Sequence, residues 1–213
     1  MALNPSTLTS PIAYPQAVML QRVQWANSWQ TTARSWFWWF GLILLGSLSH
    51  SLDIYMPWVA FAVIAGITLQ PHKAIAATLL LWLFHDGLVG GIHSEASFMT
   101  LGLWGCCMGL ALLIVTGIST LRPQFAQQSF AGHWQWIAIS MGIGFLIFEG
   151  MIAVFWNLFG GYGLDLVTFS ALFSQEMLWA IALGLAHWTI TRLLTQSNRR
   201  KSENPCQNRI VLS

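Results

Sequence analysis

The sequence predicts an all-α polytopic membrane protein with six transmembrane helices and both termini in the cytoplasm. Composition is the first reason: 55% of the 213 residues are hydrophobic and 8% are charged, whereas soluble domains carry about 25% charge. Six apolar segments and a one-sided distribution of Lys and Arg are the others. So few charged residues cannot cover the surface of a water-soluble domain of this size, which excludes cytosolic enzymes and nucleic-acid-binding proteins.

The first two apolar segments are Ser35–Leu52 and Pro57–Leu69. The first contains no acidic residue and opens with a tryptophan cluster, and tryptophan favours the headgroup level of a bilayer. The second is shorter than the roughly 20 residues of an ordinary membrane helix and ends before Pro71. We therefore expect a short tilted or re-entrant helix at this position.

The remaining four segments are long enough to cross a bilayer as helices. They cover Ala74–Ile92, Phe98–Ile118, Trp134–Phe159 and Leu166–Leu194. Their apolar runs are close to or longer than the span length, and Trp134 with Trp136 again marks a membrane boundary.

The distribution of charge predicts which side each loop faces, because Lys and Arg accumulate on the cytoplasmic side of short loops. With six crossings and a cytoplasmic N-terminus, all nine basic residues fall inside, namely Arg22, Arg34, Lys73, Arg122, Arg192, Arg199, Arg200, Lys201 and Arg209. The charged residues of the outer loops are all acidic, namely Asp53, Glu95 and Asp165. This separation would break if the second segment did not cross, since Lys73 and Arg122 would then lie on opposite sides.

The flanking regions predict a three-part organisation. Residues 1–34 are polar and form a cytoplasmic leader, mostly disordered or interfacial, in which Ala17–Trp29 has the pattern of an interfacial amphipathic helix. Residues 35–195 form the six-helix membrane domain. Residues 196–213 form a basic cytoplasmic tail, as expected next to anionic lipid.

The end of the third segment combines ionisable and small residues. His85 and Asp86 precede Gly87, Gly90 and Gly91, and glycines at helical spacing let another helix approach closely. One interpretation is a helix-contact and partner-binding site with a polar bond from Asp86, or a proton or substrate site. The other is that Asp86 caps or kinks a helix end near water. Gly142 and Gly144 offer a similar contact on the fifth segment.

Acidic residues at membrane depth are costly and mark candidate polar or ligand sites. Glu149 lies near the middle of the fifth segment without a basic residue nearby, so we expect it to be protonated or paired with His85 or His187. In the sixth segment, Glu176 and His187 share a helix face because about 10.8 residues make three turns. Trp82 and Trp104 lie deep enough to line a cavity with them, although packing is the better explanation for each.

Metal and catalytic motifs are not found. The sequence contains no His-Glu-x-x-His pattern and no Gly-x-Ser-x-Gly, and Asp86 has no second intramembrane aspartate for a dyad. We therefore expect no metal centre, no cofactor and no enzymatic activity.

The order of these features resembles the rod shape-determining protein MreD family over roughly residues 35–195. The matching elements are a short apolar span, the corner Pro71-His72-Lys73, the run from Asp86 to Gly91, a mid-helix acid at Glu149 and a last span ending in Arg192. The chain departs from the family in its longer leader, in His85 before the aspartate, and in a glutamate where an aspartate is usual.

The resemblance implies a non-enzymatic scaffold in the bacterial cytoplasmic (inner) membrane that acts in cell shape and cell-wall elongation. Its partners would be membrane lipid and a bitopic protein of the MreC type. The same plan is similar to the substrate-binding subunits of energy-coupling factor transporters. That similarity implies the alternative, a small-molecule (vitamin-type) transporter subunit whose ligand lies among the polar candidates.

Overall fold

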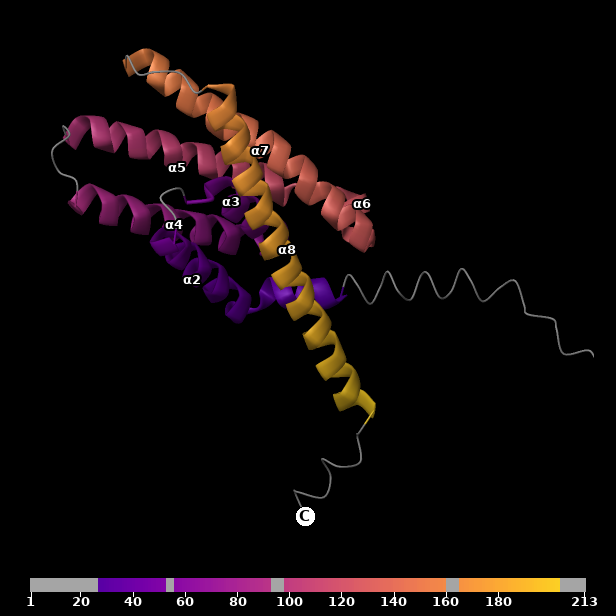
Figure 1. The fold of residues 1–213 in the computed structure, drawn as a ribbon. Coiled ribbons are helices and arrows are strands. Elements are labelled where there is room, and N and C mark those ends of the chain that lie inside the picture. Colours follow the sequence, from indigo (N-terminus) through magenta and orange to yellow (C-terminus); the bar gives the residue numbers. More distant parts are fainter. Residues whose placement is uncertain (1–26, 53–55, 93–97, 160–164, 204–213) are drawn as a thin grey trace, which may run out of the picture.

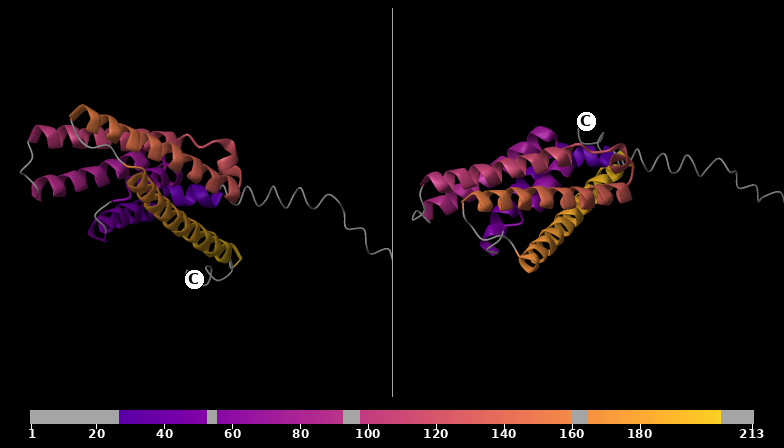
Figure 2. Two further views of the ribbon diagram at one scale, coloured as in Figure 1. Left: turned by 45° about the horizontal axis from the view of Figure 1, so that its top comes forward. Right: turned by 90° about the horizontal axis from the view of Figure 1, so that it is seen from above.

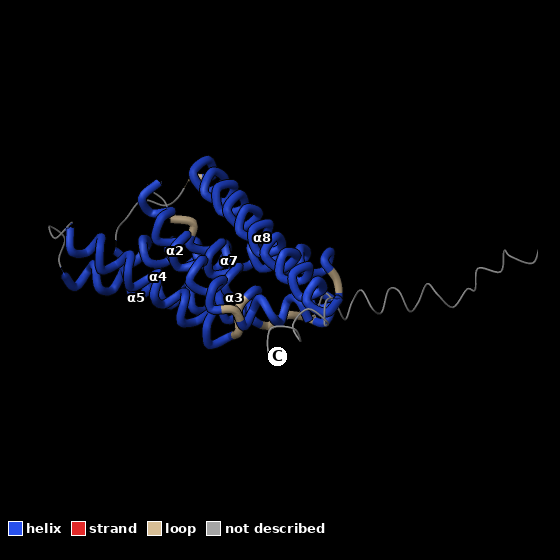
Figure 3. The backbone as a smooth tube through the Cα atoms, turned by 90° about the horizontal axis from the view of Figure 1, so that it is seen from below, coloured by secondary structure: helices blue, strands red, loops and turns tan. Residues whose placement is uncertain are grey.

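The structure is a computed structural model that describes residues 27–52, 56–92, 98–159 and 165–203. In these ranges the chain forms helices joined by short loops and no strand, which confirms the all-α prediction (Figure 3). Residues 27–34 are helical. The helices that follow are α2 (Trp36–Leu52), α3 (Trp58–Thr68), α4 (Pro71–Ile92), α5 (Phe98–Thr120), α6 (Gln124–Gln128), α7 (Phe130–Phe159) and α8 (Leu166–Glu203) (Figure 1).

Each of the six apolar segments forms a helix, with shifted ends. Helix α4 begins at Pro71 because proline fits the first turn of a helix, where its missing N–H costs nothing. Helix α8 continues to Glu203, past the predicted boundary at residue 195, because residues 195–203 contain neither Gly nor Pro. The short helix α6 and the helix at 27–34 were not predicted, and most of Ala17–Trp29 lies outside the described residues.

Membrane-spanning potential is clearest in the second half of the chain. Among the described residues, three helices are long and apolar enough to cross a membrane, namely Gly102–Thr120, Phe130–Leu158 and Leu166–Leu194. Trp36–Ser49 and Trp58–Thr68 are shorter apolar helices. These lengths are those of a membrane protein, while six crossings and cytoplasmic termini stay predictions.

Helix α3 forms the centre of the bundle. All of its 11 residues are buried, and α4, α5, α7 and α8 pack around it. Helix α8 runs obliquely to α7 (Figures 1 and 2). With a rise of about 1.5 Å per residue, α3 is only about 16 Å long, well short of the roughly 30 Å hydrocarbon layer. It is a short apolar helix shielded by longer ones.

Small residues bring α3 and α7 close to α5. A Cβ atom added at Gly66 of α3 would lie 2.6 Å from the Ser119 Cβ and 2.8 Å from the Thr116 carbonyl oxygen of α5. A Cβ added at Gly144 of α7 would lie 2.8 Å from a Val115 methyl group. Gly142, the other glycine predicted for contact on this helix, has nothing within 4 Å. Only Gly144 of that pair packs inside the bundle.

Ionisable side chains hold both ends of α3. At its start Pro57 offers no side-chain cap, and the Glu176 carboxylate accepts the N–H groups of Val59 (3.3 Å) and Ala60 (2.7 Å). At its end the Arg122 guanidinium donates to the carbonyl oxygens of Gly66 (3.0 Å) and Leu69. A negative group at the N-terminus and a positive group at the C-terminus are the signs that the helix dipole favours.

Three basic residues gather at the C-terminal end of α3. Arg122 stacks on the Trp29 ring at 4.0 Å, and burial lowers its pKa to about 9, so it stays charged at neutral pH. The Lys73 ammonium donates to the backbone carbonyl of Arg34 (2.6 Å) and lies 4.4 Å from the Trp36 ring. We call the end of the bundle marked by Arg34, Lys73 and Arg122 the basic end.

Candidate functional site

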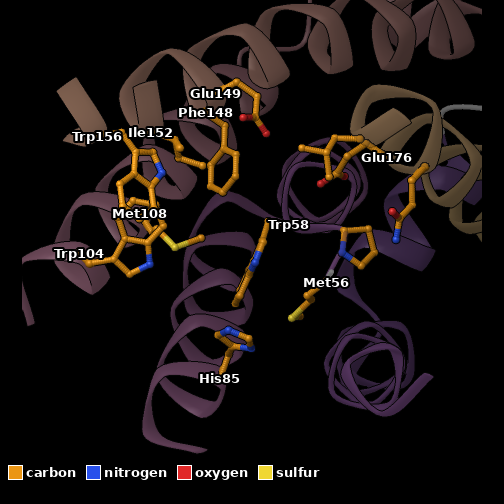
Figure 4. A pocket seen from close by; sticks show the side chains of 13 residues that line it. Met56, Trp58, His85, Trp104, Met108, Phe148, Glu149, Ile152, Trp156 and Glu176 are labelled. Atoms are coloured by element: carbon orange, nitrogen blue, oxygen red, sulfur yellow. The ribbon is translucent and has the colours of Figure 1, made fainter. Parts of the chain in front are cut away.

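A cavity of about 390 Å³ lies at the end of the bundle opposite the basic end (Figure 4). Side chains from α3, α4, α5, α7 and α8, together with the two residues before α3, line it. Trp58, the first residue of α3, lines the cavity. Arg122 is at the other end of α3, where it donates a hydrogen bond to the carbonyl oxygen of Leu69, the residue after the last one of the helix. The cavity is therefore about one α3 length away from the basic end.

Aromatic rings of Trp58, Trp104, Phe148 and Trp156 form part of the cavity wall. The Trp104 ring lies 5.4 Å from that of Trp156 and 4.9 Å from that of Phe155. The Trp58 ring meets His85 edge to face at 4.7 Å. Met56 and Met108 add flexible thioethers between the rings. The wall is apolar and polarisable, as in many small-molecule sites.

Glu176 lines the cavity but already has partners. Its carboxylate accepts two backbone N–H groups at the start of α3, and the residue is 7% exposed. Those amides would otherwise be buried without an acceptor, because the preceding Pro57 has no acceptor in its side chain. The position of Glu176 is thus explained by the architecture of α3.

Glu149 of α7 has no such explanation. It is also 7% exposed, and its carboxyl group points from α7 toward the space near Phe148 and Glu176 (Figure 4). Within the described residues, nothing donates a hydrogen bond to it or forms an ion pair with it, so neither predicted pairing, with His85 or with His187, is formed. Burial of a carboxyl group without a partner is costly. Among the polar residues of the lining, Glu149 is therefore the one that a polar or charged group of a ligand would stabilise most.

The structure brings together four of the predicted polar or ligand candidates and separates two. His85, Trp104, Glu149 and Glu176 line the cavity. Trp82 packs instead against α5, where a Cβ added at Gly109 would lie 2.8 Å from its ring.

His187 is fully buried near the middle of α8, with its ring 5.3 Å from that of Trp38 and 5.7 Å from that of His133. It shares a helix face with Glu176, as predicted from the spacing, but lies three turns further along α8. The two residues therefore belong to different clusters.

The predicted helix-contact residues lie in the last two turns of α4. Asp86, Gly87, Gly90 and Gly91 are helical, while the surroundings of their side chains lie outside the described residues. Their role in binding a partner stays a prediction.

Several lining residues were not singled out from the sequence. On α7, Ile152 and Trp156 follow Glu149 at spacings of three and seven residues, which places all three on one helix face. On α5, Met108 follows Trp104 by four residues. An aromatic residue at helical spacing from a membrane acid was the signal in the sequence that would have identified this wall.

The acidic and imidazole groups of the cavity do not make a metal site. In the parts of the chain that the structure describes, no three His, Cys, Asp or Glu side chains are grouped closely enough to hold a metal ion. His85, Glu149 and Glu176 come from three helices around the cavity.

Comparisons with protein-family models, with curated proteins and with solved structures found no match. The resemblance to the MreD family and the similarity to transporter subunits therefore rest on the residues quoted above. The function has to be inferred from the cavity.

Proposed function

We propose that this chain is a small-molecule-binding membrane protein, similar in plan to the substrate-binding subunit of a vitamin-type transporter. The cavity of about 390 Å³ that contains the unpartnered Glu149 carries the proposal. Ligand pockets in proteins measure roughly 300–1,000 Å³ and combine apolar walls with a few polar groups. A scaffold that works through helix faces does not need such a cavity. The proposed role is binding, without a catalysed reaction.

The proposed location is the bacterial cytoplasmic membrane, with the cavity on the outer side. The basic end supports this orientation, because Arg34, Lys73 and Arg122 converge there and basic residues accumulate on the cytoplasmic side. Both termini would then be cytoplasmic, and the opposite end of the bundle would face outward. A pocket open to the outside is what an importer subunit requires.

Reporter fusions test the orientation. Alkaline phosphatase fused after Gln70 or after Gln124 is expected to be inactive, because both positions lie next to the basic end and should stay in the cytoplasm. A fusion after Asp165, which immediately precedes α8, is expected to be active. Active enzyme at the first two positions would contradict six crossings and the outward-facing pocket together.

Thermal unfolding tests ligand binding. A panel of vitamin-sized cationic, neutral and anionic compounds should contain at least one that stabilises the purified chain in detergent. A ligand at about 100 times its dissociation constant adds about 2.7 kcal/mol to the free energy of unfolding. Ile152→Trp, which fills the cavity, should abolish the shift.

Ile143→Trp is the matched control, because Ile143 lies on the same helix and is 42% exposed. It should leave the shift unchanged. Equal shifts in wild type and Ile152→Trp would contradict binding in this cavity.

The MreD-like scaffold stays the competing prediction. It depends on Asp86, Gly87, Gly90 and Gly91, and its expected result is that Gly91→Leu abolishes co-purification of an MreC-type partner while insertion persists. Neighbouring genes for actin-like and MreC-type proteins would favour it, whereas genes for an ATPase and a coupling protein would favour the transporter subunit.

A further inference from the structure

We propose that the ligand of this cavity is an organic cation, held by an ion pair between its cationic group and Glu149 and by contact of its apolar body with Trp58, Trp104 and Trp156. This inference rests on the proposed binding function and adds the chemical class of the ligand. It follows from three features of the cavity: an unpartnered carboxyl group, a blocked anion site and aromatic walls.

The first feature is the lack of a positive charge near Glu149. Within the described residues its carboxyl group has neither a hydrogen-bond donor nor a cation, although the residue as a whole is only 7% exposed. Arg34, Lys73 and Arg122 lie at the basic end, about one α3 length away, and Arg192 stacks on the Trp188 ring, more than four turns beyond Glu176 along α8. A buried charge is stable only when it is paired. A cationic group on the ligand would supply that partner.

The second feature is the occupied N-terminus of α3. The amide groups at the start of a helix form a natural site for anions, and those of Val59 and Ala60 face the cavity end of the bundle. The Glu176 carboxylate already accepts both of them. An anionic ligand would have to displace Glu176 and would also meet Glu149, so the cavity disfavours it.

The third feature is the set of tryptophan rings that line the same cavity as the two acids. Trp104 and Trp156 have their ring centroids 5.4 Å apart at an angle of 49°, and Trp58 closes another side against His85 (Figure 4). Tryptophan faces attract cations electrostatically and also pack against flat apolar groups. A carboxylate and several tryptophans in one small cavity therefore suit an aromatic or aliphatic ammonium compound.

A charge series tests the proposal. The purified full-length chain in detergent is titrated with benzylamine, which is cationic at neutral pH, with its neutral analogue benzyl alcohol, and with benzoate, while tryptophan fluorescence is recorded. Benzylamine is expected to bind at least about tenfold more tightly than benzyl alcohol, since close buried charge pairs commonly contribute more than that factor. Benzoate is expected to bind more weakly than either.

Variants assign the preference to one side chain. Glu149→Gln should lower the affinity for benzylamine by about tenfold and so remove the preference. Glu149→Asp keeps the carboxyl group and should retain most of the preference for benzylamine over benzyl alcohol. Ile143→Trp, outside the cavity, should behave as wild type.

Two results would overturn the cation proposal alone, and a third would overturn the proposed function as well. Equal affinities for benzylamine and benzyl alcohol in the wild-type chain would refute the cation preference while leaving a small-molecule pocket in place. A preference that persists in a folded Glu149→Gln protein would refute the role of Glu149. If no probe binds up to millimolar concentration and Ile152→Trp has no effect in the vitamin panel, the proposed function fails with it.

Discussion

Replacing Glu176 by leucine is expected to lower the free energy of unfolding by about 3 kcal/mol or more. The change leaves the N–H groups of Val59 and Ala60 without their acceptor, and both residues are fully buried. An unsatisfied buried donor costs about 1–3 kcal/mol. Because α3 packs against four longer helices, a weakened first turn should affect the whole bundle.

Unfolding in mixed detergent micelles, followed by circular dichroism, measures this effect. Glu176→Gln keeps one acceptor oxygen of similar geometry and should lose roughly half as much stability. Glu149→Gln breaks no hydrogen bond within the described residues and should change stability by less than about 1 kcal/mol. A Glu176→Leu protein as stable as wild type would show that the carboxylate is not needed to cap α3.

Gly66→Leu is expected to cost about 3 kcal/mol, near the upper end for overpacked cores. A Cβ atom at this position would lie 2.6 Å from Ser119 Cβ and 2.8 Å from the Thr116 carbonyl oxygen. The carbonyl belongs to the backbone of α5, so a rotamer change cannot relieve the clash. Helices α3 and α5 would have to separate, and the hydrogen bond between Thr78 and Thr116 (3.0 Å) lies beside that interface.

Gly142→Leu is the matched control, because nothing lies within 4 Å of a Cβ atom at that position. It should be neutral or slightly stabilising, since glycine in a helix interior costs about 1 kcal/mol relative to alanine. The same unfolding assay compares the two proteins. Equal losses in Gly66→Leu and Gly142→Leu would mean that α3 and α5 are less closely packed than described.

Helix positions were predictable from the sequence because they depend on local properties. The sequence alone gives the length of each apolar run, the tryptophans at its ends, and the prolines Pro57 and Pro71. None of these depends on contact with another helix. The shortness of α3 was predicted for the same reason. The sixth apolar segment, Leu166–Leu194, was predicted with the bounds that the structure gives to the apolar part of α8. The helix itself continues to Glu203, because nothing in the residues that follow the segment disfavours a helix.

The different roles of Glu149 and Glu176 could not be predicted from the residues next to them in the sequence. Glu149 and Glu176 were both recognisable as costly in apolar segments, and nothing in their neighbouring residues separated them. The fold places Glu176 against the amides of α3, 116 residues away in the chain, and leaves Glu149 facing the cavity.

Hydrogen-bond partners and cavities arise from packing between helices, which hydrophobic periodicity does not encode. The apolar segments, their helical structure and the acidic residues within them could therefore be predicted from the sequence alone. The cap on α3, the shape of the cavity and the identity of the unpartnered carboxyl group depended on how the helices pack around α3.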